Sequence, residues 1–343
     1  MTFTERLGMA LPVIQAPMAG LQGSAMAVAV SNAGGLGSLP CAMLSPQALH
    51  SELSVLREQT SRAYNVNFFC HAVPAADAAR EAAWRAALAP YYAEFGLDLA
   101  GVPAGAGRVP FGEDFADVLQ DFKPAVVSFH FGLPSAALMA RVRGWGSTIM
   151  SSATTVQEAI WLEAHGADAI IAQGFEAGGH RGMFLSGDVS TQLGTLALLP
   201  QVLRAVRVPV IAAGGVADAA GVAAMLSLGA AAVQVGTAYL LCDEATTSAP
   251  HRLALQSDEA AHTALTNVFT GRPARGIVNR VMRELGPLSA AAPDFPLATA
   301  AMAPLRAAAE KRGSGDFSPL WAGQNVSGCR PVGAADMTRL LAP

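Results

Sequence analysis

The sequence predicts an α/β fold: a TIM (β/α)8 barrel with an added smaller, mostly helical domain that covers the substrate. Two observations lead to this prediction. Short apolar runs recur eight times along the 343 residues, and most are separated by alanine-rich segments of helical character, so strand and helix alternate. The chain is 52% hydrophobic and only 14% charged, as expected for strands covered on both faces. Eight such units favour the barrel over the competing topology, a doubly wound sheet.

The expected strands end at Gly, Pro, Ser or Asn, residues that commonly terminate strands. Segments rich in Ala, such as Thr155–His165 and Ala217–Leu228, separate them and favour helices. The eight expected strands are Val13–Ala16, Leu36–Leu39, Asn65–Phe69, Ala125–Phe129, Thr148–Ser152, Ala169–Ala172, Val208–Ala212 and Ala231–Val235.

Two stretches are longer than a strand–helix repeat needs. The first holds an amphipathic segment, Ala75–Phe95, and then a passage rich in Gly and Pro. The second includes His262–Arg275 and the alanine-rich Leu297–Glu310. We therefore expect three parts: a cofactor-binding barrel over residues 1–242 with an insertion at about 70–123, a helical segment over 243–311 that covers the substrate, and a tail over 312–343 that packs back on the barrel.

Charge and hydropathy exclude several classes of partner. The net charge is −4, and no run of Lys or Arg forms a patch that would bind nucleic acid or anionic lipid. Residues 7–51 and 219–242 contain no Asp, Glu, Lys or Arg, but repeated Pro and Gly interrupt them, so we expect buried core rather than membrane spans. The sequence does not indicate an oligomeric state.

The compartment is expected to be the cytoplasm. Glu5 and Arg6 are followed by prolines rather than by the apolar segment and cleavage site of a signal peptide. The cysteines are widely spaced and form no C-x-x-C pair, which favours a reduced setting and no metal site. They are Cys41, Cys70, Cys242 and Cys329.

The most informative stretch is Gln173–Gly182, where paired glycines precede a histidine after an apolar run. Glycine lets backbone approach a ligand closely, and histidine, here His180, is the residue type whose ordinary pKa lies nearest neutral pH. A second imidazole, His130, ends the fourth expected strand, although it could instead be a core histidine bonded to backbone. Glu176 and Arg181 would either orient His180 or pair with each other in solvent. The remaining histidines are expected to be solvated: His50, His71, His165, His251 and His262.

Two glycine-containing loops follow the last two expected strands. Gly214 and Gly215 end the run that starts at Val208, and Gln234-Val235-Gly236-Thr237 ends the next run. Loops after the seventh and eighth strands of such barrels commonly bind phosphate through backbone N–H groups and a helix N-terminus, and Asp218 would lie near that N-cap. The alternative is that the paired glycines form only a tight turn.

Amide side chains are expected at the same mouth. Gln15-Ala16-Pro17-Met18 closes the first strand, Asn67 lies in the third and Gln173 ends the sixth. A ring with many hydrogen-bonding edges and a phosphate tail would use such a lining fully, whereas a sugar phosphate would not. Flavin mononucleotide (FMN) fits best.

With these motifs the chain resembles the nitronate monooxygenases of the class I bacterial type, formerly called 2-nitropropane dioxygenases. The resemblance implies a barrel with non-covalently bound FMN that oxidises alkyl nitronates with O₂ to carbonyl compounds and nitrite, with propionate 3-nitronate and nitroalkanes as candidate substrates. It rests on Val13–Gly20, Asn32–Gly37, Gln173–Gly182, Ala212–Asp218 and Gln234–Thr237, with a weaker match at Leu320–Gln324.

The resemblance also implies roles for single residues. His180 would be the catalytic base and His130 a second active-site histidine. Lys311 is a candidate for a lysine that the family often places near the substrate, although residues 243–311 lack the tyrosines that often accompany it. The expected flavin contacts are Ala16, Pro17, Met18, Asn67, Gln173, Gly178, Gly179, Gly214, Gly215, Gln234, Val235, Gly236 and Thr237.

The sequence leaves three alternative functions and argues against a fourth. FMN enzymes that use NAD(P)H share the fold, namely an enoyl-acyl-carrier-protein reductase and NADH:quinone reductases. A catalytically idle flavin-binding protein is the third, and the paired histidines speak against it. Barrels of the inosine monophosphate dehydrogenase kind use a nucleophilic cysteine after the sixth strand, but residues 174–190 contain none.

Overall fold

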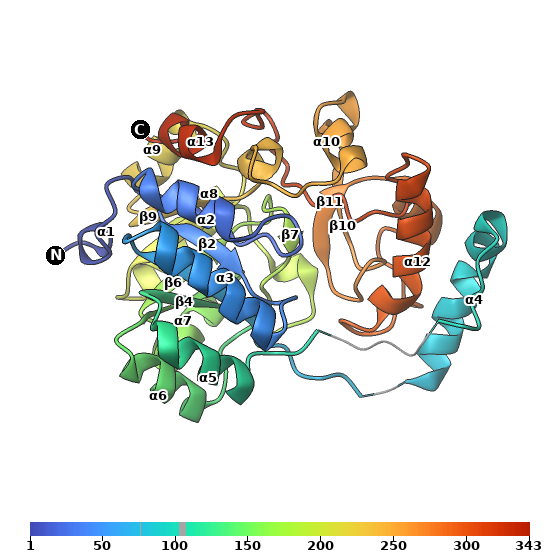
Figure 1. Ribbon diagram of the computed structural model, residues 1–343, viewed down its shortest axis with the longest axis horizontal. Helices are drawn as coiled ribbons and strands as arrows, with labels where there is room; N and C mark the ends of the chain where they lie inside the picture. Colours follow the sequence, from blue (N-terminus) through green and yellow to red (C-terminus); the bar gives the residue numbers. More distant parts are fainter. Residues whose placement is uncertain (76, 103–107) are drawn as a thin grey trace.

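The computed structural model describes residues 1–75, 77–102 and 108–343 (Figure 1). Within this range, eight parallel strands form one sheet: β1 (Val13–Gln15), β2 (Gly37–Pro40), β3 (Tyr64–Phe69), β4 (Val126–His130), β5 (Thr148–Ala153), β6 (Ala169–Gln173), β8 (Val210–Ala213) and β9 (Ala232–Val235). Their order is β1-β9-β8-β6-β5-β4-β3-β2. A parallel bridge between Ile14 and Leu36 closes the ring. The predicted barrel is confirmed, and an open doubly wound sheet is excluded.

The barrel strands are apolar on both faces because each face meets a different core. In β6, Ile170 packs with the helix layer around Leu198 and Val202, whereas Ile171 packs inside the barrel with Phe3. Phe3 belongs to α1 (Phe3–Arg6), whose side chains close one end of the barrel. This double burial explains the near-continuous apolar runs of the sequence.

Helices cover the outside of the barrel and begin at polar caps. Ser45 caps α3 (Pro46–Gln59), and Thr155 caps α7 (Val156–Ala164). Asp218 caps α9 (Ala219–Ser227) by accepting a 2.7 Å hydrogen bond from the N–H of Gly221, as predicted for this position. The helices around the barrel are α2 (Ser24–Asn32), α3 (Pro46–Gln59), α5 (Glu113–Phe122), α6 (Ala136–Gly144), α7 (Val156–Ala164), α8 (Thr195–Ala205), α9 (Ala219–Ser227) and α13 (Ala334–Leu340).

A second unit lies beside the barrel mouth and contains a small antiparallel sheet in the order β10-β11-β7. Strand β7 (Gly179–His180) lies in the loop that follows β6, so the glycine–histidine stretch is held by a segment 94 to 96 residues later: Ala274 pairs with His180 and Arg275 with Gly179. The sequence patterns did not predict these strands. The elements of this unit are β7 (Gly179–His180), β10 (Thr263–Thr266), β11 (Ala274–Ile277), α10 (Ala249–Leu255), α11 (Arg280–Leu285) and α12 (Ala298–Lys311).

Helix α4 (Ala78–Phe95) comes from the expected insertion yet packs against α12, on its far side from the barrel (Figure 1). The indole N–H of Trp84 donates to the carbonyl of Ala298 at 3.3 Å, and the Tyr92 hydroxyl donates to that of Ala301 at 2.6 Å. Both side chains join one apolar cluster with Leu305. The glycine-rich passage after α4 includes residues 103–107, which lie outside the described residues.

The chain end returns to the barrel. Met337 and Leu341, in and after α13, share a core with Val13 and Val30, and the hydroxyls of Thr338 and Tyr239 are 2.9 Å apart. Short 3₁₀ turns complete the described chain: η1 (Val189–Thr191), η2 (Thr237–Leu241) and η3 (Asp258–Ala261). None of the described helices is long and apolar enough to cross a lipid bilayer.

Candidate active site

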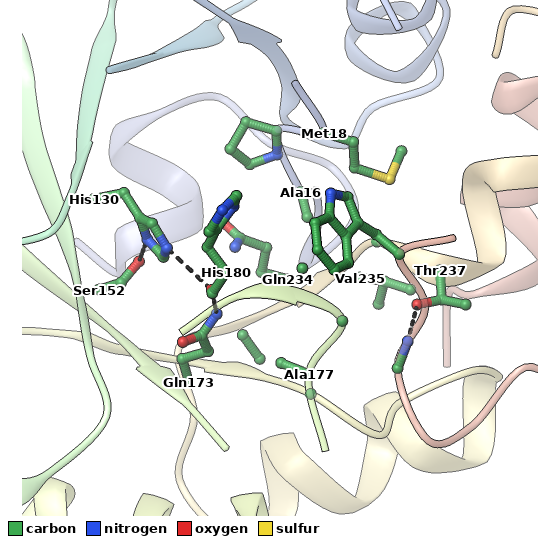
Figure 2. A pocket seen from close by; sticks show the side chains of 18 of the residues that line it. Ala16, Met18, His130, Ser152, Gln173, Ala177, His180, Gln234, Val235 and Thr237 are labelled. Carbon is green, nitrogen blue, oxygen red and sulfur yellow. Dashed lines mark hydrogen bonds between the residues drawn. The ribbon is translucent and has the colours of Figure 1, made fainter. Parts of the chain in front are cut away.

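One cavity lies at the carboxyl ends of the barrel strands, where loops from all sides of a parallel barrel meet. The two histidines and all of the expected flavin contacts line it, and Figure 2 shows several of them. The full set is Ala16, Pro17, Met18, Asn67, His130, Gln173, Gly178, Gly179, His180, Gly214, Gly215, Gln234, Val235, Gly236 and Thr237. The structure thus brings together residues that are up to 221 positions apart, Ala16 and Thr237 being the extremes.

The imidazole of His180 stands in an aromatic enclosure, with ring centroids 5.3 Å from Phe295 and 5.6 Å from Trp321. Its Nε2 lies 2.9 Å from the hydroxyl of Thr270, and its Nδ1 has no hydrogen-bond partner among the described residues. Burial, followed by the nearby positive charge of Arg108, holds the pKa of His180 well below its usual value. The ring is therefore neutral at pH 7.

His130 holds the backbone of His180. Its Nε2 lies 3.1 Å from the carbonyl oxygen of His180, and because a carbonyl only accepts, Nε2 carries the hydrogen. Its Nδ1 then accepts from the hydroxyl of Ser152 at 3.0 Å. Burial lowers the pKa of His130 from 6.5 to about 3, so this neutral tautomer persists. Both ring nitrogens of His130 therefore form hydrogen bonds. His130 lines the cavity and is also bonded to backbone, so it has both the cavity position and the backbone bond that the sequence analysis gave as alternatives.

Gln173 clamps the same loop from the end of β6. Its Nε2 donates to the carbonyl of His180 at 3.0 Å (Figure 2), and its Oε1 accepts from the N–H of Gly182 at 2.7 Å. Arg181 lies between these positions and is fully buried. Its Nη2 donates to the backbone carbonyl of Gln173 at 2.9 Å, and its Nε donates to the side chain of Gln192 at 2.6 Å.

The expectation that Glu176 and Arg181 pair in solvent is wrong. Glu176 accepts hydrogen bonds from the N–H and hydroxyl of Thr195, at 2.8 and 2.9 Å, whereas Arg181 is buried on other partners. Sequence proximity did not reveal this because α8, which carries Thr195, returns to the glycine loop only in the folded barrel.

The glycine loops at the other end of the cavity adopt conformations that other residues rarely take. Gly214 and Gly215, after β8, have φ of 117° and 74°. The C-terminal tail crosses here: the amide of Asn325 donates to the carbonyl of Gly215 at 3.0 Å, and the N–H of Gly323 donates to the hydroxyl of Thr237 at 3.0 Å. Polar backbone and a hydroxyl therefore gather where a phosphate would bind.

The cavity fits a flavin by two observations. Gln234 lines it, and its Oε1 is buried with no hydrogen-bond partner among the described residues, an arrangement that a ligand N–H or O–H would satisfy. A Cβ added at Gly179 would meet no described atom within 4 Å, so open space lies against this backbone.

Residues 2–341 match the family model described as nitronate monooxygenase. The chain belongs to the nitronate monooxygenase family. A nitronate monooxygenase of Pseudomonas aeruginosa is 43% identical over 99% of this chain and 97% of its own length. A nitronate monooxygenase of Paraburkholderia phytofirmans is 42% identical over 98% of this chain and 92% of its own. The solved nitroalkane oxidase of Streptomyces ansochromogenes superposes with a TM-score of 0.90 at 39% identity, covering 98% of this chain and 96% of its own.

Membership makes this nitronate monooxygenase family protein a flavin-dependent oxidoreductase. Within it, Lys311 is exposed at the end of α12 and is absent from the described cavity lining. The lysine that the resemblance suggested near the substrate is therefore not supplied by Lys311 in this structure.

Two histidines of this family member were wrongly expected to be solvated. His71 is buried, with its ring 4.8 Å from that of Phe295, and its Nε2–H donates to the carbonyl of Arg108 at 2.9 Å. His251 is buried, and its Nε2–H donates to the carbonyl of Trp321 at 3.1 Å. In each case a segment distant in sequence encloses the ring.

The cavity also holds residues that the sequence analysis missed, notably Arg108, Ser152 and Trp321. Ser152 lies at the end of an expected strand, so the rule that found His130 and Gln173 would have found it. Trp321 lies in the weakly matching tail. Arg108 had no local signal, because nothing in a glycine- and proline-rich insertion shows which side chain reaches the mouth.

Proposed function

We propose that this protein binds FMN and oxidises alkyl nitronates with O₂ to carbonyl compounds and nitrite. The observation that carries the proposal is a single cavity lined by the glycine loops, by Gln234, whose buried Oε1 has no hydrogen-bond partner among the described residues, and by the neutral imidazole of His180. Family membership and the similarity to a nitroalkane oxidase support the same chemistry.

The residues present indicate how FMN would be held. Backbone N–H groups at Gly214, Gly215 and Gly236 and the hydroxyl of Thr237 would bind the phosphate, and Gln234 would accept from a polar edge of the cofactor. Asn67, Gln173, Gly178 and Gly179 would line the ring side, with Ala16, Pro17, Met18 and Val235 as apolar neighbours. When bound, FMN supplies the electron acceptor that passes reducing equivalents to O₂.

His180 would act on the proton of the substrate. A nitronate is already deprotonated at carbon and needs no base, whereas a neutral nitroalkane must lose its α-proton. The free Nδ1 of His180 is the basic nitrogen if Nε2 donates to Thr270. His130 and Gln173 would hold the ring in place through its own carbonyl.

The second unit would close the substrate side of the cavity. Phe295 and Trp321, from segments near α12 and from the tail, lie against His180 and exclude water from it. The four cysteines are free, which supports a cytoplasmic setting for the reaction.

The release of nitrite from a nitronate tests the proposal. Protein loaded with FMN is mixed with ethyl nitronate in air, and nitrite, acetaldehyde and O₂ consumption are measured together. Catalytic formation of nitrite and acetaldehyde is expected. The alternative, an FMN-dependent NAD(P)H oxidoreductase such as an enoyl-acyl-carrier-protein or quinone reductase, predicts instead that anaerobic NADH or NADPH rapidly bleaches the flavin, and that result without nitrite release would overturn the proposal.

A further inference from the structure

Arg108 carries the only formal charge among the described residues that line the cavity, taking both histidines as neutral. It is half-buried and lies in the insertion between β3 and β4. A cation in a cavity of otherwise neutral groups loses hydration, which costs free energy. Only a bound anion offsets this cost. Its position therefore needs a reason beyond packing.

The described chain supplies no carboxylate to Arg108. No salt bridge and no hydrogen bond of its guanidinium is formed with a described residue, and the remaining residues, Ala76 and 103–107, contain no acidic side chain in the sequence. Burial lowers the pKa of Arg108 to about 10, so the group stays charged at pH 7. A standing positive charge thus faces the cavity unneutralised.

Two contacts position Arg108, one through its side chain and one through its backbone. Its Cζ lies 5.4 Å from the centroid of the Phe295 ring, a cation–π distance, and His71 binds its backbone carbonyl. The same Phe295 ring lies 5.3 Å from the ring of His180. Arg108 and His180 therefore contact one aromatic side chain and belong to the same end of the cavity.

Arg108 lies on a different side of the cavity from the loop expected to bind the cofactor phosphate. In the strand order, β3 lies four places from β8, which is the opposite side of an eight-stranded barrel. The chain reaches Arg108 from β3, whereas Gly214 and Gly215 follow β8. An anion bound by Arg108 would thus be distinct from the phosphate of the cofactor.

We propose that Arg108 is a specificity-determining residue that binds the negative charge of the substrate and so favours a nitronate anion over the neutral nitroalkane. This inference rests on the proposed function. A planar guanidinium matches the two oxygens that share the charge of a nitronate, as it matches a carboxylate. In the cavity without an anion the same positive charge also disfavours protonation of His180, so this imidazole does not supply a second positive charge beside Arg108.

The test uses acetate and acetamide, which have nearly the same shape and differ in charge. Each is titrated into FMN-loaded protein while the flavin absorbance is followed, so no turnover is needed. The R108M variant should raise the Kd of acetate at least about tenfold and that of acetamide less than about twofold. R108K should recover part of the acetate affinity. The KM for ethyl nitronate should rise in R108M, and that for nitroethane should stay nearly unchanged.

The matched control is R312M, which removes another arginine that lies over an aromatic ring, Phe95, outside the cavity lining. It should leave acetate affinity unchanged, and FMN content and thermal unfolding should be the same in all variants. Unchanged acetate affinity in R108M, equal losses for acetate and acetamide, or loss of bound FMN overturns the inference. Absence of nitrite release from wild-type protein would instead refute the proposed function, and the acetate titration remains readable without it.

Discussion

The carbonyl oxygen of His180 accepts a hydrogen bond from Nε2 of His130 at 3.1 Å, so one active-site histidine holds the backbone of the other. Because a carbonyl only accepts, this bond places the hydrogen of His130 on Nε2. The other nitrogen, Nδ1, then accepts a hydrogen bond from the Ser152 hydroxyl. On the proposed function the two imidazoles would have different tasks. His180 would present a basic nitrogen to the substrate, and His130 would control where that nitrogen lies.

Replacing His180 with Asn should separate the two classes of substrate. A neutral nitroalkane needs a base, so its kcat/KM should fall by about 10²- to 10⁴-fold, whereas a preformed nitronate should lose far less. Initial rates of nitrite release from nitroethane and ethyl nitronate measure the difference. Equal losses on both substrates would show that His180 does not act as the base.

Replacing His130 with Gln should change the pH dependence of stability. The folded-state pKa of about 3 lies below the unfolded value of 6.5, so the unfolded chain binds more protons as pH falls below 6.5 and stability is lost. Between pH 7 and pH 5 this group alone should reduce the free energy of unfolding by about 2 kcal/mol.

Urea unfolding at the two pH values measures that loss in wild type and in H130Q. The buried carboxylates are common to both proteins, so the difference between them isolates the histidine. The variant should lose less stability on acidification than wild type. A variant with the wild-type pH dependence would show that His130 is not held neutral in the fold.

The two loop glycines should respond differently to alanine. A Cβ at Gly178 would lie 2.6 Å from backbone atoms of Ala322 and Gly323, so G178A should displace the tail and weaken cofactor binding severely. A Cβ at Gly179 meets open space but forces φ of 70° on a residue with a side chain, at about 1–2 kcal/mol.

Flavin content after purification and thermal unfolding compare G178A and G179A. G179A should keep most of its flavin while its turnover falls, because the strain adjoins His180. Similar flavin loss in both variants would argue against the tail contact as the cause.

Replacing Gln234 with Leu removes a buried oxygen that has no partner among the described residues. The cofactor-free protein should be as stable as wild type or more so, because an unsatisfied buried acceptor costs about 1–3 kcal/mol. The Kd for FMN should rise about tenfold or more, since the bound cofactor loses an acceptor. Fluorescence titration with FMN and thermal unfolding of the apoprotein test both statements. Unchanged FMN affinity would place Gln234 outside the cofactor site.

Local sequence pattern was sufficient for the barrel and for most of the cavity. Each of the eight strands lies within two residues of its expected bounds, because an apolar run ended by a strand-terminating residue is a local signal. In a parallel barrel the carboxyl ends of all strands meet at one mouth. Residues such as His130, Gln173 and Gly236 could therefore be placed together without knowledge of any long-range contact.

Only the tertiary structure decided what encloses those residues. Strand β7 exists because β11 pairs with it, His71 is buried because Phe295 packs on it, and α4 packs against α12 although 214 positions separate Trp84 from Ala298. Such contacts depend on how distant segments approach, which residue periodicity does not encode. The paired glycines and His180 are determined by the sequence. The position of the Arg108 charge near His180, and the hydrogen bond from His130 to the His180 carbonyl, are decided by the fold.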